Sequence, residues 1–236
     1  MSSPRKVAIV TGASRGIGAG LVAALRGDGY AVVATARSVA DSDAADLLTV
    51  RGDITDPETA ELVVQQALAR FGQIDSLINN AGLFVSKPFT DYTVDDYASV
   101  TGVNLLGFLH ITQRVIGPMV AQGSGHIVNI TTSLVDHALS ASPSALASLT
   151  KGGLAAVTRS LATEYAGRGV RVNAIAPGIV ASSLDDPGSY EALAGLHPLG
   201  RTASIEDIVD AVRYLERATF VTGETLHVDG GMAAGH

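Results

Sequence analysis

The chain has 236 residues, 47% of them hydrophobic, and is long enough to bury a substantial core as one domain. It has no cysteine, which excludes disulfides, iron–sulfur sites and thiol nucleophiles, and we expect no metal site. A net charge of −7 without a basic block argues against nucleic-acid or membrane partners, and no segment reaches the ~20 apolar residues of a membrane span. No hydrophobic leader precedes the first apolar run, so a cytoplasmic location is expected.

Short apolar runs alternate with segments of helical periodicity along the whole chain. The runs are nearly continuous rather than alternating, which is typical of strands buried on both faces of a parallel sheet. Predicted strands cover residues 7–10, 31–34, 76–78, 126–130, 170–175 and 225–228, and predicted helices cover about 16–26, 58–71, 95–122, 144–167 and 205–216. Asp56 and Ser204 are expected N-caps. The alternation predicts a single doubly wound α/β domain, a parallel sheet with helices on both faces.

A glycine-rich loop follows the first predicted strand and leads directly into a helix. Residues 11–18 read Thr-Gly-Ala-Ser-Arg-Gly-Ile-Gly, a G-x-x-x-G-x-G spacing. Glycines let the backbone turn tightly and approach a pyrophosphate, and a helix N-terminus offers free N–H groups with a partial positive charge. The loop therefore predicts a nucleotide phosphate site made by Gly12, Ser14, Arg15, Gly16, Ile17 and Gly18.

The end of the second predicted strand indicates which dinucleotide this site prefers. An NAD site places an acid there for the ribose hydroxyls, whereas an NADP site needs a cation for the additional phosphate. The strand ends in Arg37 without an acid, and Arg15 in the glycine loop is a second cation directed at the same region. Guanidinium groups bind phosphate through paired hydrogen bonds, so the sequence predicts NADP(H) as the cofactor.

Several further motifs lie at positions that carry a family resemblance. They are Asp53 in Gly-Asp-Ile-Thr, the Asn-Asn-Ala-Gly run at 79–82, Asn104, the Pro-Gly pair at 177–178, His-Pro-Leu-Gly-Arg at 197–201 and Val-Asp-Gly-Gly at 228–231. With the glycine loop, they make nearly the whole chain resemble the short-chain dehydrogenase/reductase family in its small single-domain form. The resemblance is strongest to β-ketoacyl carrier-protein reductases and similar carbonyl reductases. It implies a Rossmann-like NADP-binding domain spanning residues 1–236, assembled as a homotetramer or homodimer.

The resemblance also implies roles for individual residues. Those expected to contact the cofactor are Asp53 and Ile54 at the adenine, Asn80, Ala81 and Gly82 at the adenosine ribose, and Pro177, Gly178 and Ile179 at the nicotinamide. The main chain of Asn104 is expected to hold a water in a proton relay. Lys151 is expected to bind the nicotinamide ribose and to lower the pKa of a neighbouring hydroxyl.

The family pattern is broken at the proton donor. The family has a tyrosine four residues before the lysine, whose phenol protonates the carbonyl oxygen, but this position holds Ala147. Tyr165 lies 14 residues beyond the lysine, about 20 Å along a helix, which is out of reach. Counted from the predicted strand at 126–130, the family's serine falls on Thr132, with Ser133 beside it. Counting back from Lys151 overshoots this position, because the connecting segment is about two residues longer than usual. Either hydroxyl is a candidate for binding the substrate oxygen.

Several groups are candidates to replace the phenol. Ser144, Ser148 and Lys151 share one helical face, and either serine is able to relay a proton although it is a poor acid. His137 is another candidate, because an imidazole is a side chain that is able to act as an acid in proteins. Water or an acidic hydroxyl of the substrate is a further alternative.

Two functions are compatible with this sequence. The first is an NADP(H)-dependent oxidoreductase that reduces a carbonyl or conjugated small molecule with a non-standard proton donor. The alternative is a catalytically silent NADP(H)-binding protein, acting as a sensor or as an oligomeric partner. The substrate is expected to meet an apolar wall of Leu83, Phe84, Leu134 and Val135 and a flap at 182–199, which together do not identify it.

Overall fold

Seven parallel strands form one sheet in the computed structural model, which describes residues 5–140, 142–181 and 193–235. The spatial order is β3-β2-β1-β4-β5-β6-β7. The strands are β1 (Val7–Thr11), β2 (Ala31–Ala36), β3 (Leu47–Arg51), β4 (Ser76–Asn79), β5 (Gly125–Ile130), β6 (Val170–Pro177) and β7 (Thr225–Val228). The chain therefore reverses its direction of winding between β1 and β4, where open α/β sheets bind their ligands.

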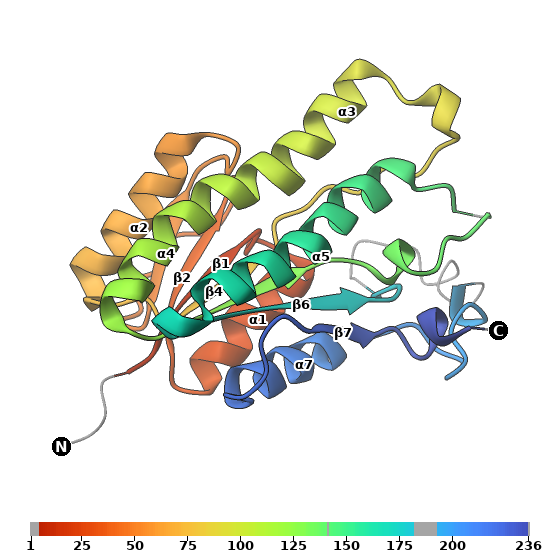
Figure 1. Ribbon diagram of the computed structural model, residues 1–236. Helices are drawn as coiled ribbons and strands as arrows, with labels where there is room; N and C mark the ends of the chain where they lie inside the picture. The colour runs from red at the N-terminus through yellow and green to blue at the C-terminus, as the bar shows by residue number, and fades with distance from the viewer. Residues whose placement is uncertain (1–4, 141, 182–192, 236) are drawn as a thin grey trace.

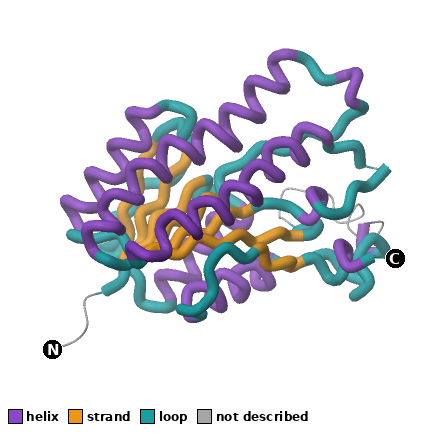
Figure 2. The backbone as a smooth tube through the Cα atoms, viewed as in Figure 1, coloured by secondary structure: helices purple, strands orange, loops and turns teal. Residues whose placement is uncertain are grey.

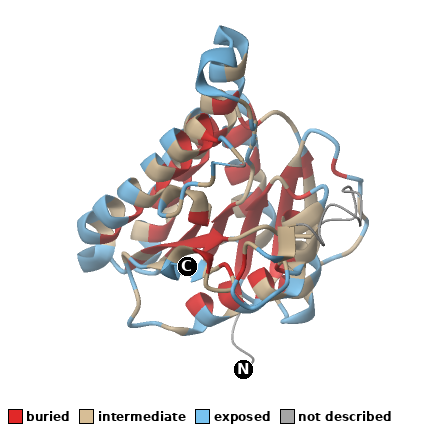
Figure 3. Ribbon diagram, turned by 90° about the vertical axis from the view of Figure 1, so that its right-hand side faces the viewer, coloured by how far each residue is buried: buried red, intermediate tan, exposed pale blue. Residues whose placement is uncertain are grey.

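Helices cover both faces of the sheet (Figures 1 and 2), which confirms the predicted fold class. The helices α1 (Gly16–Gly27) and α7 (Ile205–Arg217) pack on one face, and α2 (Pro57–Phe71), α4 (Phe108–Gln122) and α5 (Ala145–Tyr165) pack on the other. The central strands are the most deeply buried part of the molecule (Figure 3). None of the helices in the described ranges is long and apolar enough to cross a membrane.

The edges of the sheet differ from the sequence-based prediction. The strand β3 was not among the predicted strands, because Leu47–Arg51 is a half-buried edge strand that mixes apolar residues with a threonine and an arginine. The opposite edge strand, β7, was predicted but is only half-buried rather than covered on both faces. The expectation of strands buried on both sides therefore holds for the interior of the sheet and fails at its two edges.

The predicted long helix at 95–122 contains a change of helical type. A regular helix α3 (Val94–Thr101) continues as a π-helix, η2 (Gly102–Gly107), before α4 begins. A π-helix widens the turn and displaces backbone groups from the regular ladder, and such segments often occur at functional sites. Here the widened turn contains Asn104, which is buried beneath the sheet's carboxyl edge.

Capping residues set the helix starts as predicted. The Asp56 side chain accepts from the backbone N–H of Glu58, with Pro57 in the first turn. Ser204 forms a reciprocal capping box with Asp207. The pKa of Asp207 is lowered chiefly by a hydrogen bond from Arg201 and further by the bonds from Ser204. The N-cap of α5 is Ser144, whose side chain makes no capping hydrogen bond.

A buried polar network ties the amino edge of the sheet together. Glu216 at the end of α7 accepts hydrogen bonds from Ser76 (2.8 Å), Tyr30 (3.1 Å) and the Nδ1 of His126 (2.8 Å). The Nε2 of His126 accepts from the amide of Asn173 at 3.1 Å, which assigns the proton to Nδ1. Burial lowers the pKa of His126, so its ring is neutral, whereas burial would raise the pKa of Glu216 and the hydrogen bonds from its partners lower it instead.

Candidate active site

A cavity of about 660 Å³ opens at the carboxyl ends of β1, β2 and β4, where the winding reverses. Every residue predicted for the adenosine and phosphate side lines it except Gly18. These lining residues are Gly12, Ser14, Arg15, Gly16, Ile17, Arg37, Asp53, Ile54, Asn80, Ala81 and Gly82. The structure thus brings together residues from four separate segments of the sequence.

Thr11 connects the glycine loop to the end of β4. Its Oγ1 accepts the backbone N–H groups of Asn80 (3.1 Å) and Ala81 (3.0 Å). In return, the Asn80 amide donates to the carbonyls of Thr11 (2.9 Å) and Gly12 (3.2 Å). The two backbone segments that border the cavity are therefore held at a fixed separation.

Glycine is required where these segments meet. Gly12 has φ +66°, and a Cβ there would lie 2.8 Å from the Cα of Ala81. A Cβ on Gly18 would lie 2.2 Å from the carbonyl oxygen of Gly12. Gly18 is buried and does not line the cavity, so in this structure it allows close packing beneath the loop.

The charged groups of the cavity are arranged at the start of α1 and the end of β2. No side chain caps α1, its first turn carries no acid, and its N-cap residue is Arg15. Arg37 follows β2 and lowers the pKa of Asp53, although hydrogen bonds from Thr55 contribute more to that shift. The cavity thus offers a free helix N-terminus and two exposed guanidinium groups.

Lys151 and Asn104 lie next to each other beyond the cavity. The Lys151 Nζ donates to the carbonyl of Ile130 at 2.7 Å, and a Cβ built on Gly82 would lie 3.0 Å from Nζ and 3.4 Å from the Asn104 Oδ1. The Asn104 side chain accepts from the N–H of Leu83 (2.8 Å) and donates to the carbonyl of Leu83 (3.0 Å). Burial lowers the pKa of Lys151 to about 8.

The two hydroxyls predicted near the substrate oxygen have different surroundings. Ser133 is fully buried and donates to the carbonyl of Pro177 at 2.9 Å. Thr132 is half-buried and accepts from the N–H of Leu134 at 3.3 Å, so its own proton has no acceptor among the described residues. Thr132 is therefore the more accessible of the two hydroxyls.

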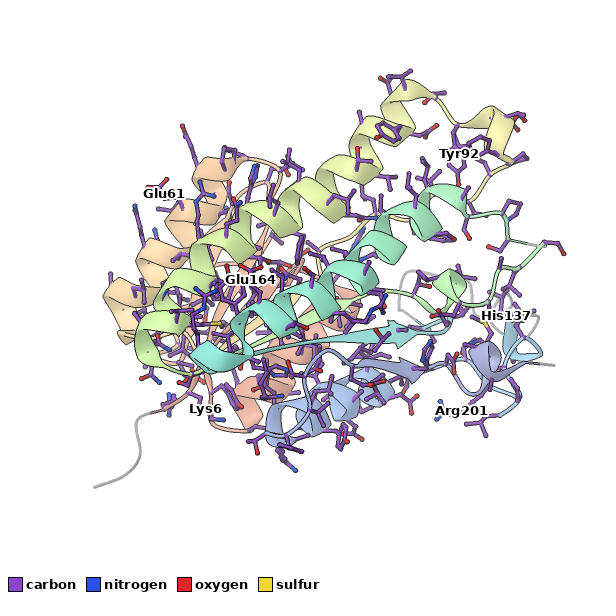
Figure 4. All side chains as sticks on the ribbon, in the orientation of Figure 1. Lys6, Glu61, Tyr92, His137, Glu164 and Arg201 are labelled. Atoms are coloured by element: carbon purple, nitrogen blue, oxygen red, sulfur yellow. The ribbon has the colours of Figure 1, made fainter. Side chains whose placement is uncertain are left out.

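The side chains that are candidates to replace the predicted phenol come from α5 and from the segment after β5, and Ala147 itself is buried. Ala147 is only 2% exposed, and one residue further along α5 the hydroxyl of Ser148 donates to the carbonyl of Leu134 at 3.3 Å. Ser144 is buried at the helix start. His137 lies at the right-hand edge of Figure 4, beyond the carboxyl end of β6, and is half-buried.

The residues predicted for the nicotinamide side follow β6 and do not line the large cavity. Pro177 ends the strand, and the N–H of Ile179 donates to the Nε2 of His197 at 3.1 Å. A Cβ on Gly178 would lie 2.7 Å from the same nitrogen, so His197 packs directly beneath this segment. The predicted flap at 182–199 falls largely on 182–192, which lie outside the described residues.

Sequence reasoning missed some residues of the cavity. Val180 and Ile205 line it although neither was predicted as a site residue, as do Thr35, Ala36, Ser38, Gly52 and Val103, whereas Leu83, which also lines it, was predicted for the substrate wall. Most of these flank a predicted residue at the end of a strand, and that adjacency is the signal that would have found them. Ile205 had no such signal, because it comes from the start of α7.

The topology and the glycine-bordered cavity define a doubly wound α/β protein of the Rossmann type. A family model described as enoyl-(acyl carrier protein) reductase matches residues 12–233. The chain belongs to the short-chain dehydrogenase/reductase family, as the resemblance implied.

Individual relatives cover almost the entire chain. It is 37% identical over 237 residues to L-xylulose reductase of Mesocricetus auratus, covering 95% of each protein. It is 33% identical over 243 residues to the 3-oxoacyl-(acyl-carrier-protein) reductase FabG of Escherichia coli strain K12, covering 98% of this chain and 99% of that protein. The solved structure of ElxO with NADP bound superposes with a TM-score of 0.91 at 26% identity, covering 98% of this chain and 100% of the other. These relatives support an oxidoreductase.

Proposed function

We propose that this protein is an NADP(H)-dependent reductase of carbonyl or conjugated small molecules that works without the family's tyrosine. The observation that carries the proposal is the cavity at the β1–β4 switch point, with Arg15 and Arg37 on its border and Lys151 and Asn104 beyond it. The relatives support the same class of reaction, because by name they include an L-xylulose reductase and a 3-oxoacyl-(acyl-carrier-protein) reductase.

The shape of the phosphate loop fits a dinucleotide. The missing Cβ atoms of Gly12 and Gly18 allow the loop to pack against the end of β4, and side chains there would close the approach. The uncapped start of α1 leaves backbone N–H groups for the pyrophosphate. Asp53 and Ile54 border the same cavity from the loop after β3 and are proposed to contact the adenine.

The preference for the phosphorylated cofactor is proposed to come from two arginines. Arg15 and Arg37 are exposed and line the same cavity, so both are able to bind a 2′-phosphate by charge-assisted hydrogen bonds. The Oδ1 of Asp53 accepts from both the backbone N–H and the hydroxyl of Thr55, so this oxygen is already engaged within the loop.

The residues beyond the cavity are proposed to orient the substrate and manage its proton. NADPH, when bound, supplies the hydride for the reduction. Lys151 is proposed to hold the nicotinamide ribose, and the Thr132 hydroxyl is free to donate to the substrate oxygen. Pro177, Gly178 and Ile179 are proposed to border the nicotinamide, and the main chain of Asn104 to hold a relay water within the widened π-helical turn.

Binding and turnover together test this proposal. Titration calorimetry with NADPH and NADH should give tighter binding of NADPH, and absorbance at the reduced nicotinamide band should fall when ketones, keto sugars, β-ketoacyl thioesters, quinones or enones are added. Tight NADPH binding without turnover of any acceptor would favour the catalytically silent alternative. An absence of binding heat with both cofactors would remove the proposed function altogether.

We also propose that the chain forms a homodimer or homotetramer. Its proposed location is the cytoplasm, which cell fractionation tests. Large apolar side chains are exposed on neighbouring elements: Val94 and Tyr97 of α3, Leu106 and Leu109 of η2 and α4, and Leu149 of α5. A second copy of the chain is the proposed cover for this surface. Light scattering should give a multiple of the 24.1 kDa chain mass.

A matched pair of leucine variants locates the interface. Leu149→Asp should shift the scattering mass toward the monomer, whereas Leu62→Asp on α2, which is not one of the proposed interface residues, should leave it unchanged. Both leucines are about half exposed, so neither substitution places a charge in the core. A monomeric parent protein would contradict the proposed assembly.

A further inference from the structure

We propose that Lys151 donates the proton to the substrate's carbonyl oxygen, in place of the absent phenol. This inference rests on the proposed reductase function and assigns its proton donor. Lys151 follows Ala147 by one helical turn, so both side chains leave the same face of α5. The methyl group of Ala147 provides no hydroxyl between that ammonium group and a substrate.

The Lys151 ammonium group has hydrogen-bonding capacity to spare. Lys151 is 91% buried. Of the three N–H donors of its ammonium group, one has a partner among the described residues, the carbonyl of Ile130. Nζ also lies against Gly82, whose missing side chain leaves the approach from the cavity open. Two donors are therefore available for the cofactor ribose and the substrate oxygen.

The other hydroxyls near α5 are poorer candidates. Ser133 is fully buried and donates to Pro177, and Ser148 donates to Leu134. Thr132 is accessible, but an alkyl hydroxyl is a much weaker acid than an ammonium group, so it binds the oxygen without protonating it. Among the described residues, Lys151 combines an ionisable proton with a position beside Asn104 and the cavity.

Among the described residues, no acidic group is paired with Lys151. On the elements packed against α5, Asp96 pairs with Lys87, Asp136 with His227, His126 with Glu216 and Arg168 with Glu164. Asp95 and Tyr97 of α3 are exposed to solvent. Arg171 of β6 donates to the carbonyls of Ala218 and Val221. Burial is the cause that lowers the Lys151 pKa to about 8, close to the value that a general acid needs at physiological pH.

The proton balance of the step is simple. As the carbonyl carbon accepts the hydride supplied by NADPH, the N–H bond of Lys151 breaks and an O–H bond forms on the carbonyl oxygen. The products are an alcohol, NADP⁺ and a neutral lysine amine, which then takes a proton from solvent. Reduction requires the protonated amine, so the rate is expected to be constant below the Lys151 pKa and to fall above it.

The ionisation of Lys151 is measurable without cofactor or turnover. The chain contains three lysines, so protein labelled with ¹³C at lysine Cε gives three side-chain signals, and Lys151→Arg identifies the one of interest. That signal should titrate with a midpoint near pH 8. A midpoint at the ordinary lysine value of about 10.4 would overturn the inference.

The second measurement separates proton donation from binding. Lys151→Arg keeps the positive charge but has a far weaker acid, so kcat should fall by roughly 10²-fold while the NADPH dissociation constant changes less than tenfold. The kcat of the parent enzyme should fall tenfold per pH unit above pH 8. The kcat of Lys151→Arg should show no such fall over the same pH range. Lys87→Arg, which preserves the ion pair with Asp96 away from the cavity, is the matched control and should match the parent.

The results distinguish this inference from the proposed function. An unchanged kcat in Lys151→Arg, or a loss confined to NADPH affinity, overturns the proton-donor role while the reductase function stands. A parent protein that fails to bind NADPH overturns the reductase function, and the lysine titration of the cofactor-free chain is still interpretable. If Lys151→Arg fails to fold, the lysine titration and the pH profile of the parent decide the question.

Discussion

The two ends of the candidate site differ in how completely their parts are assembled. At the phosphate end, Thr11, Gly12 and Asn80 bond the glycine loop to β4, and almost every predicted residue borders one cavity. At the reaction end, the position where the family resemblance predicts a tyrosine holds Ala147, and the more accessible of the two candidate hydroxyls is that of Thr132. Apart from Lys151, which is proposed to serve both cofactor binding and proton transfer, the two ends use different residues, so each end can be altered separately at those other positions.

Restoring the phenol should have the largest effect on this contrast. Ala147→Tyr places an aromatic hydroxyl one turn before Lys151, so kcat for ketone reduction should rise by about 10²-fold, the low end of the range for general acids because Lys151 already donates. Steady-state kinetics at pH 7 measures the gain. Ala147→Phe is the control, since it adds the ring to a 2% exposed position without the hydroxyl. Equal rates for both variants would contradict the expected role of the phenol.

Removing the two arginine charges should weaken binding of the cofactor's additional phosphate and leave the reaction end of the site unchanged. Arg15→Ala combined with Arg37→Ala should lower NADPH affinity about 30-fold, because two exposed, solvent-screened contacts to phosphate are lost. NADH affinity should change less than threefold. Calorimetry with both cofactors gives the ratio, and Arg159→Ala on the exposed side of α5 is the matched control. Equal losses for NADPH and NADH would show that these arginines do not read the 2′-phosphate.

A methyl group beneath the loop should disturb binding through packing. In Gly18→Ala, the new Cβ meets the Gly12 carbonyl at 2.2 Å, so the loop must shift and NADPH affinity should fall about tenfold, with a loss of unfolding free energy of about 1–3 kcal/mol. Gly27→Ala lies in the same helix with nothing within 4 Å of its Cβ. That control should bind NADPH like the parent and be slightly more stable. Calorimetry and urea unfolding measure both quantities, and equal behaviour of the two variants would contradict this packing argument.

The buried polar network at the amino edge of the sheet lies away from the candidate site, so its effect on the free energy of unfolding should depend on pH and not on the cofactor. Because the folded His126 has a lowered pKa, the unfolded chain binds more protons, and stability should fall as the pH drops below the unfolded value of ~6.5. His126→Gln keeps both hydrogen-bonding directions and should remove this slope at a loss of about 1 kcal/mol at pH 7. Urea unfolding at pH 7.5, 6.0 and 5.0 measures it, with the exposed His227→Gln as control. A variant with the parent's slope would exclude His126 as its source.

The sequence predicted the fold well because its signals are local and repeated. Buried parallel strands read as continuous apolar runs, and the caps at Asp56 and Ser204 begin their helices where expected. Signals failed where burial is partial: the edge strand β3 gave no continuous run. The π-helix was also missed, because a shift in helical register at Gly102–Gly107 depends on packing beneath the sheet's edge and not on residue periodicity.

The sequence predicted most of the residues that line the cavity, but not how the residues of the candidate site are arranged and bonded. Motif positions at strand ends identified the cavity lining, since the carboxyl ends of parallel strands meet at one edge. Sequence could not distinguish Thr132 from Ser133, because the difference lies in a hydrogen bond from Ser133 to Pro177, 44 residues away. Lys151 was expected to act through a neighbouring hydroxyl, and its own spare donors emerge only from its burial and single carbonyl partner.

The Glu216 network has a consequence for engineering this scaffold. Its members lie at the rim opposite the crevice, so a library of substitutions around Thr132, Ala147 and Lys151 leaves those interlocked side chains untouched. Substituting Glu216 instead would leave three donors, Ser76, Tyr30 and His126, without their shared acceptor. Variants with new substrate specificities should therefore be sought by substituting residues around Thr132 and Ala147 while the Glu216 network is kept unchanged.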